Sequence, residues 1–176
     1  MRPAAAELVD RPQETRKVGL DAHVCCNCYE RGRVRTSPPA GCDPSVSEDG
    51  SLLCGSDDLN LQIEFDNWQY GQACEHQRGY LVSHYIGNVA LVAFLREELG
   101  RWPDRFPMIL SRVVYNGIHG GDFIPAVDVP QLVPEVEALA GVHHPVPEDE
   151  RFLRAFEKQM WDLVTAALRV SKPIAF

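Results

Sequence analysis

The chain has 176 residues, 45% of them hydrophobic and 24% charged, which is enough for a single domain with a substantial buried core. Its formal net charge is −8, and its densest basic patch is the three arginines of segment 31–35, too few for nucleic-acid binding that depends on phosphate contacts. No stretch is apolar enough to span a bilayer, because the best candidate, residues 88–99, ends in Arg96, Glu97 and Glu98. We therefore expect no nucleic-acid partner and no membrane.

Residues 1–17 hold two prolines and show neither a helical nor a strand period. They also lack the apolar centre of a secretory signal peptide. We interpret residues 1–17 as a flexible tail and residues 18–176 as one domain, with the cytoplasm as the expected location. The six cysteines are then expected to be reduced, buried or metal-bound rather than paired in disulfides.

The first half of the chain predicts two strands and one helix. Residues 18–29 are rich in strand formers, and their alternation places Ala22, Val24, Cys26 and Cys28 on one face. A Pro-Pro pair and a glycine make residues 36–43 a loop, and residues 51–54 form a short strand after the Asp49-Gly50 turn. Residues 57–73 have helical spacing, with Asp57 or Asp58 as the cap.

The second half mixes the two kinds of element without regular alternation. Strands are expected at 81–86, 108–115 and 123–127, and an edge strand at 172–176. Helices are expected from the Asn88 cap to Leu99, from Pro130 after the Asp128 cap, and over 148–170. The pattern predicts an α+β (mixed α/β) fold, a small sheet packed by about four helices with a long C-terminal helix.

Two short motifs contain residues that bind soft metal ions. Cys26 and Cys28 flank one asparagine, and Cys74 and His76 flank one glutamate, so that together they make a Cys₃His set suited to tetrahedral zinc. Structural zinc sites usually place two or more residues between paired ligands, whereas here there is one. On a helix, Cys74 and His76 would point about 200° apart, so the helix must end by Ala73 for both to reach one ion.

Two other interpretations of these cysteines stay open. Cys26 and Cys28 could face the core as small hydrophobic residues, since free cysteine is among the most buried residue types. One of the cysteines could instead be a nucleophile, with His76, His84 or His119 as its base. No local signature of a cysteine hydrolase surrounds any of them.

Four further residues are candidates for contact with a ligand or a partner. Asn116, His119 and Asp122 lie in a glycine-rich loop after an apolar segment, a place where α/β domains often present binding groups. The alternative is a turn whose polar side chains bind their own backbone. Asp66, on the aromatic-rich predicted helix, is the fourth candidate.

The motifs Gly19-Leu20-Asp21, Cys26-Asn27-Cys28 and Ala73-Cys74-Glu75-His76 resemble those of a group of uncharacterised bacterial proteins. Members of that group open with Met-Gly-Leu-Asp or Met-Gly-Phe-Asp, and the resemblance covers most of the chain after Val18. The group has no established activity, so the resemblance implies no mechanism.

Two classes of function remain as expectations. The first is a small acidic protein that binds another protein, for example an immunity protein that neutralises a basic toxin, because a charge of −8 would steer association with such a partner. The second is a metal-dependent or cysteine-based enzyme built on Cys26, Cys28, Cys74 and His76. A zinc site is compatible with either class.

Overall fold

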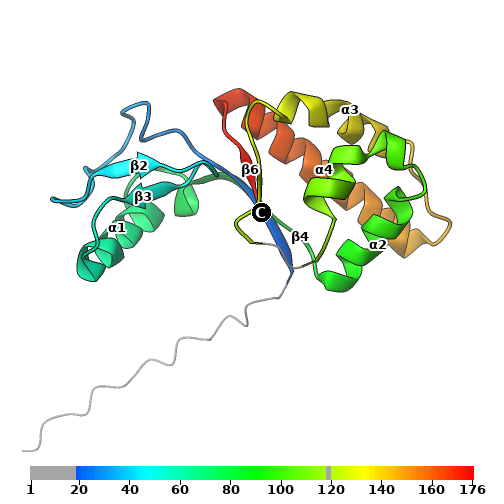
Figure 1. Ribbon diagram of the computed structural model, residues 1–176, viewed down its shortest axis with the longest axis horizontal. Helices are drawn as coiled ribbons and strands as arrows, with labels where there is room; N and C mark the ends of the chain where they lie inside the picture. The colour runs from blue at the N-terminus through cyan, green and yellow to red at the C-terminus, as the bar shows by residue number, and fades with distance from the viewer. Residues whose placement is uncertain (1–18, 118–119) are drawn as a thin grey trace, which may run out of the picture.

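The computed structural model describes residues 19–117 and 120–176. The predicted tail, residues 1–17, and His119 lie outside the described residues. The chain has the predicted α+β fold: a small antiparallel sheet separates a group of helices on one side from a smaller substructure on the other (Figure 1).

The main sheet has four strands in the order β4-β1-β6-β5. Its strands are β1 (Leu20–Cys25), β4 (Tyr80–Gly87), β5 (Phe123–Ile124) and β6 (Ile174–Ala175). β1 and β4 pair antiparallel over their whole length although 54 residues separate the end of one from the start of the other. The intervening segment therefore leaves the sheet and returns to it at nearly the same point.

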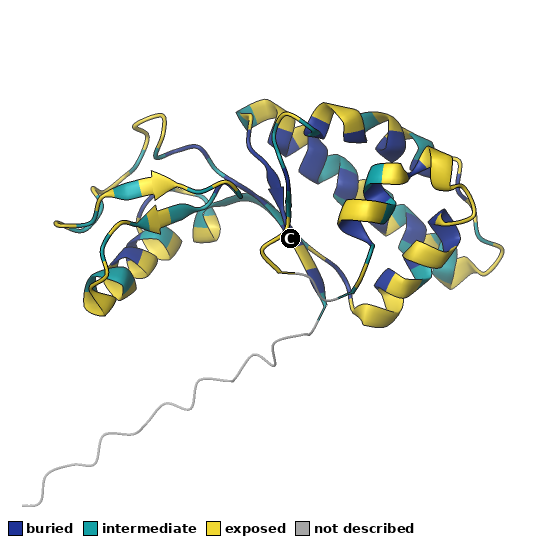
Figure 2. Cartoon of the chain, in the orientation of Figure 1, coloured by how far each residue is buried: buried dark blue, intermediate teal, exposed yellow. Residues whose placement is uncertain are grey.

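Three helices lie on one side of this sheet: α2 (Val89–Leu99), α3 (Val129–Leu139) and α4 (Pro147–Val170). Asn88 caps α2 as predicted, its side chain accepting from the Leu91 N–H. The buried stripe of α4 matches its sequence period and packs on β1, β4 and β6. Figure 2 shows the buried residues concentrated where these helices meet the sheet, and 26 buried side chains of the described part of the chain form one continuous core there.

The strand predicted at 108–115 is wrong, because residues 107–113 are helical and include a π-helical turn at Ile109–Val113. Pro107 occupies the first helical position, where its missing N–H is not needed. The buried Glu135 carboxylate of α3 accepts hydrogen bonds from the N–H groups of Met108 and Ile109, both at 2.8 Å. The periodicity of a short apolar run does not distinguish a strand from a helix. Here the Glu135 carboxylate, distant in sequence, caps the segment as a helix.

The prediction of an edge strand at 172–176 is also corrected. β6 pairs with β1 through His23 and Ala175 and with β5 through Phe123 and Ala175, so it is an inner strand of the sheet. Residues 172–176 are all buried, which an edge position would not achieve.

Residues 26–79, which we call the small lobe, form the substructure on the other side of the sheet (Figure 1). It contains the hairpin β2 (Pro44–Val46) and β3 (Leu52–Cys54), the helix α1 (Leu59–Gly71), and a 3₁₀ turn (Gln77–Gly79). The predicted strand at 51–54 and the predicted helix at 57–73 are confirmed, and Asp58 caps α1; β2 was not predicted. Its own core is small, with only Phe65, Trp68 and Ala73 buried together.

Replacement of Glu135 by alanine is expected to lower the free energy of unfolding by about 2–4 kcal/mol, because two buried N–H groups lose their acceptor. Chemical denaturation measures the change. Glu137→Ala is the matched control, since Glu137 is exposed two residues further along α3 and should change stability by less than about 0.5 kcal/mol. Equal effects of the two substitutions would contradict the capping role.

Candidate metal centre

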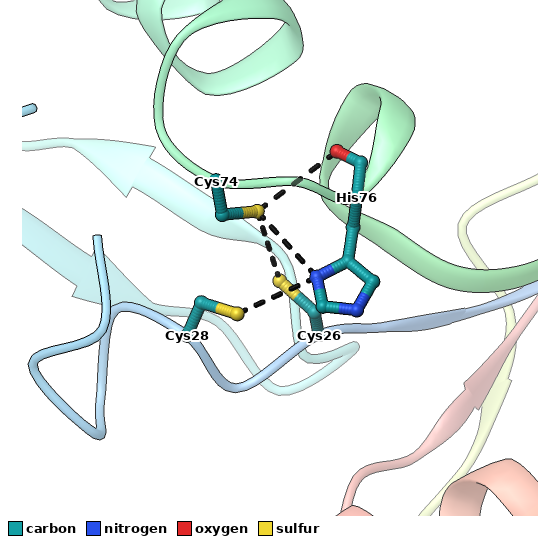
Figure 3. A group of neighbouring side chains, drawn as sticks. All are labelled: Cys26, Cys28, Cys74 and His76. Carbon is teal, nitrogen blue, oxygen red and sulfur yellow. Dashed lines mark hydrogen bonds between the residues drawn. The ribbon is translucent and has the colours of Figure 1, made fainter. Parts of the chain in front are cut away.

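The four predicted Cys/His ligands meet at one point at the base of the small lobe (Figure 3). One donor atom from each of Cys26, Cys28, Cys74 and His76 lies within 4.8 Å of the other three. The Sγ atoms of Cys26 and Cys74 are 3.7 Å apart. His76 Nδ1 lies 3.4 Å from Cys28 Sγ and 3.6 Å from Cys74 Sγ. The group could hold a metal ion.

The first pair of donors follows the end of β1 rather than lying on it. The strand stops at Cys25, and the Cys26 N–H donates to the Gly79 carbonyl at 2.8 Å. The Cys28 carbonyl then accepts from the Arg33 N–H at 2.7 Å, which closes a tight turn that contains Gly32 at a φ of 62°. The turn, not strand alternation, directs both sulfurs to the same side.

The second pair follows the end of α1. The helix ends at Gly71, and the N–H groups of Gln72 and Ala73 both donate to the Trp68 carbonyl at 2.8 Å. Cys74 and His76 therefore lie in non-helical backbone, and the condition that the helix end by Ala73 is met. The 3₁₀ turn Gln77–Gly79 then returns the chain to β4.

Further hydrogen bonds hold the two pairs of donor residues close to each other. The Arg35 N–H donates to the Ala73 carbonyl at 2.7 Å and so joins the segment after the first pair to the segment before the second. Asn27, the buried residue between the two cysteines, donates through Nδ2 to the Val170 carbonyl at 3.5 Å, and its Oδ1 accepts from Arg33. The first pair is thus fixed to the end of α4.

The protonation of these thiols bears on their chemistry. Burial raises the pKa of Cys26 to about 12 and also raises the pKa of Cys28. The neighbouring Cys25 is also buried, and burial raises its pKa to about 11. A cysteine nucleophile needs a lowered pKa, so these surroundings do not favour Cys26 or Cys28 as a nucleophile.

The other candidate residues do not line the pocket beside this group. Asp66 is exposed on α1, and Asn116 is exposed in its loop. The carboxylate of Asp122 accepts a hydrogen bond from the Tyr115 hydroxyl, and its carbonyl accepts from the Phe176 N–H at 2.9 Å. The prediction for His119 lies outside the described residues.

A second pair of thiols was missed in the sequence. Cys42 and Cys54 lie at the open end of the β2–β3 hairpin, with their Sγ atoms 2.6 Å apart. The Asp49-Gly50 turn was the available signal. A hairpin built around that turn pairs Pro44 with Cys54 and so places Cys42 near Cys54. The small lobe therefore contains five of the six cysteines in two separate groups.

Comparison of the chain with protein-family models, with curated proteins and with solved structures finds no significant match in any of the three. Among the described residues, no helix is both long enough and apolar enough to cross a membrane.

Mild oxidation is expected to join Cys42 to Cys54, because their sulfurs need only a small movement to reach bonding distance. Burial and the neighbouring Cys54 thiol raise the pKa of Cys42 to about 11. The thiolate is the reacting species, so the rate should rise with pH between about 7 and 10. Intact mass after treatment with oxidised glutathione, followed by peptide mapping, measures the loss of two hydrogens. A dominant link from Cys42 to any cysteine but Cys54 would contradict this expectation.

Proposed function

We propose that this protein is a zinc-stabilised binding protein, in which one Zn²⁺ held by Cys26, Cys28, Cys74 and His76 organises the small lobe for contact with another protein. The convergence of the four donor atoms within 4.8 Å carries the zinc part of the proposal. Tetrahedral zinc, with Zn–S near 2.3 Å and Zn–N near 2.0–2.1 Å, places sulfurs about 3.8 Å apart and sulfur and nitrogen about 3.5 Å apart. The separations of 3.7, 3.4 and 3.6 Å agree with those edges.

The donor set favours a structural over a catalytic ion. Catalytic zinc sites keep one position open for water or substrate, whereas structural sites use four protein ligands. Here three sulfurs and one imidazole nitrogen would fill all four positions around the ion. This is why we prefer a binding protein to the metal-dependent or cysteine-based enzyme that remains the alternative.

The position of the ion in the chain explains why it would be needed. Cys26 and Cys74 are 48 residues apart in sequence, and the segment between them includes the hairpin and α1. That segment has three buried core residues, against 26 in the core around the sheet. Substructures of this size usually need a metal or a disulfide in addition to their core. Zinc would close the small lobe at its base.

The charge of the small lobe supports a basic partner. Residues 36–77 contain eight Asp and Glu residues and no Lys or Arg, so this one segment accounts for the entire net charge of −8. The rest of the chain is balanced, with 17 residues of each sign. A surface of one sign attracts a partner of the other and accelerates their association.

The exposed face of α1 supplies apolar contact within this acidic surface. Leu59, Ile63 and Tyr70 recur at helical spacing and are 72%, 59% and 48% exposed. Asp66 lies on the same stripe, while Phe65 and Trp68 are buried on the opposite side against the hairpin. A helix with apolar residues on both faces, one of them exposed, is typical of a docking surface. A basic protein, such as a toxin that this chain would neutralise, fits both features.

Protein purified without added metal is expected to contain about one equivalent of zinc by elemental analysis, because the four donors complete its coordination. Cys74→Ser should reduce this to less than about a tenth of an equivalent, since metal affinity depends on each thiolate. Cys54→Ser is the matched control, because Cys54 lies in the same lobe and contributes no donor to the group.

The same samples test what the ion does. Removal of zinc by a chelator should increase amide hydrogen exchange across residues 59–71 while α4 keeps its protection, because only the small lobe depends on the ion. Absence of zinc from the unmodified protein, or equal exchange in α1 with and without zinc, would overturn the structural role.

Docking is tested with the purified product of the adjacent gene by titration calorimetry. Ile63→Lys should weaken binding by roughly tenfold or more, since an exposed apolar side chain that the partner would cover becomes a charge of the same sign as the partner. Leu168→Lys on α4 is the control, because Leu168 is similarly apolar and exposed but lies outside the small lobe. Affinity that is insensitive to Ile63→Lys and to salt would contradict docking through this face.

A further inference from the structure

A second feature of the small lobe is a pocket of about 570 Å³ where the small lobe meets the end of α4, and the four Cys/His donors and Glu75 form part of its wall. Its lining includes four arginines and two apolar residues, Arg31, Arg33, Arg35, Arg169, Leu81 and Val170. We propose that this pocket binds a small molecule carrying phosphate groups, of about the size of a nucleotide. The site is separate from the docking face of α1, and its charge comes from arginines rather than from the metal.

The backbone of the turn directs the arginines into the pocket. Val34 packs against the small core around Trp68, whereas Arg33 and Arg35, on either side of it, line the pocket. Their N–H groups are held by the carbonyls of Cys28 and Ala73, each at 2.7 Å. The positions from which these two side chains extend are therefore fixed before any ligand arrives.

Arg169 approaches from the opposite wall, in the last turn of α4. The contact between the walls is held by Asn27 on Val170 and by the buried Lys172, which donates to the Gly50 carbonyl at 3.1 Å and pairs with Glu30. Pockets between two substructures are common ligand sites. A ligand here would touch both lobes at once.

The positive charge of the four pocket arginines is larger than the negative charge of the groups around them. Arg35 is 3.9 Å from Glu75, an exposed and therefore weak ion pair, and Arg33 donates to Asn27. No salt bridge joins Arg31 or Arg169 to any residue within 19–117 or 120–176. A Zn(Cys)₃His centre carries a net charge of about −1, so together with Glu75 it would leave the four arginines with an excess of about +2.

The chemistry of the lining selects phosphate. Guanidinium groups bind phosphate oxygens through paired N–H donors, and several arginines around one pocket suit a ligand with more than one phosphate. Leu81 and Val170, both half-buried, offer apolar contact for the organic part of such a ligand. The volume is within the range of small-molecule sites, whereas the acidic surface of residues 36–77 would repel a long nucleic acid.

The test is titration calorimetry of the zinc-loaded protein with ADP, pyrophosphate and inorganic phosphate, and with sulfate as a general anion. We expect ADP and pyrophosphate to bind at least about tenfold more tightly than sulfate, because they engage more than one arginine. Arg33→Gln and Arg169→Gln should each weaken ADP binding by roughly tenfold. Arg151→Gln is the control, since Arg151 is 80% exposed on α4 and does not line the pocket, and should leave binding unchanged.

Three results would overturn the proposal: equal affinity for sulfate and for ADP, loss of affinity in Arg151→Gln as large as in Arg33→Gln, or tighter binding of a single-stranded RNA hexamer than of ADP. A fourth result would also overturn it: the unmodified protein binds no phosphate compound, and Arg33→Gln and Arg169→Gln each lower its zinc affinity. The arginines would then serve only to stabilise the thiolates. Zinc content measured in every variant separates failure of the pocket from failure of the metal site.

Discussion

The organisation of this protein depends on one closure: the two ends of residues 26–79 meet where Cys26 and Cys28 face Cys74 and His76. β1 and β4 are neighbours in the sheet, so the chain must leave and return at one place, and the ligands stand at those two points. Closing a long segment at its base lowers the entropy that its small core must offset. Under the proposed zinc site, the small lobe is the part of the molecule whose order would depend on this contact.

The same closure separates charge on the surface. Arginines at positions 31, 33 and 35 lie just after the first pair of ligands, whereas residues 36–77 between them and the end of the lobe carry only acidic charge. One small substructure thereby presents a basic pocket at its base and an acidic, partly apolar helix face away from it. The two proposals, a basic protein partner and a phosphate ligand, do not conflict, because the acidic helix face and the arginine pocket are different surfaces.

Local signals in the sequence predicted local structure well. The caps of α1 and α2 and the long apolar stripe of α4 depend on residues within a few positions of each other, and the structure confirms them. Two predictions were wrong: the strand at 108–115, where the chain is helical, and the edge position of the last strand, which is an inner strand. In the first case a carboxylate from α3 caps the helix. In the second, a strand from the far end of the chain enters between β1 and β5. Both structures depend on contacts with residues distant in sequence.

The sequence by itself determined the chemistry of the candidate site: three thiols and one imidazole in two short motifs. Whether the two motifs meet was decided only by the tertiary structure, because their approach requires β1 and β4 to pair across the intervening segment. The second thiol pair and the arginine pocket depend on the same long-range folding. Donor types follow from residue identity, whereas the distances between donors follow from contacts that no local pattern specifies.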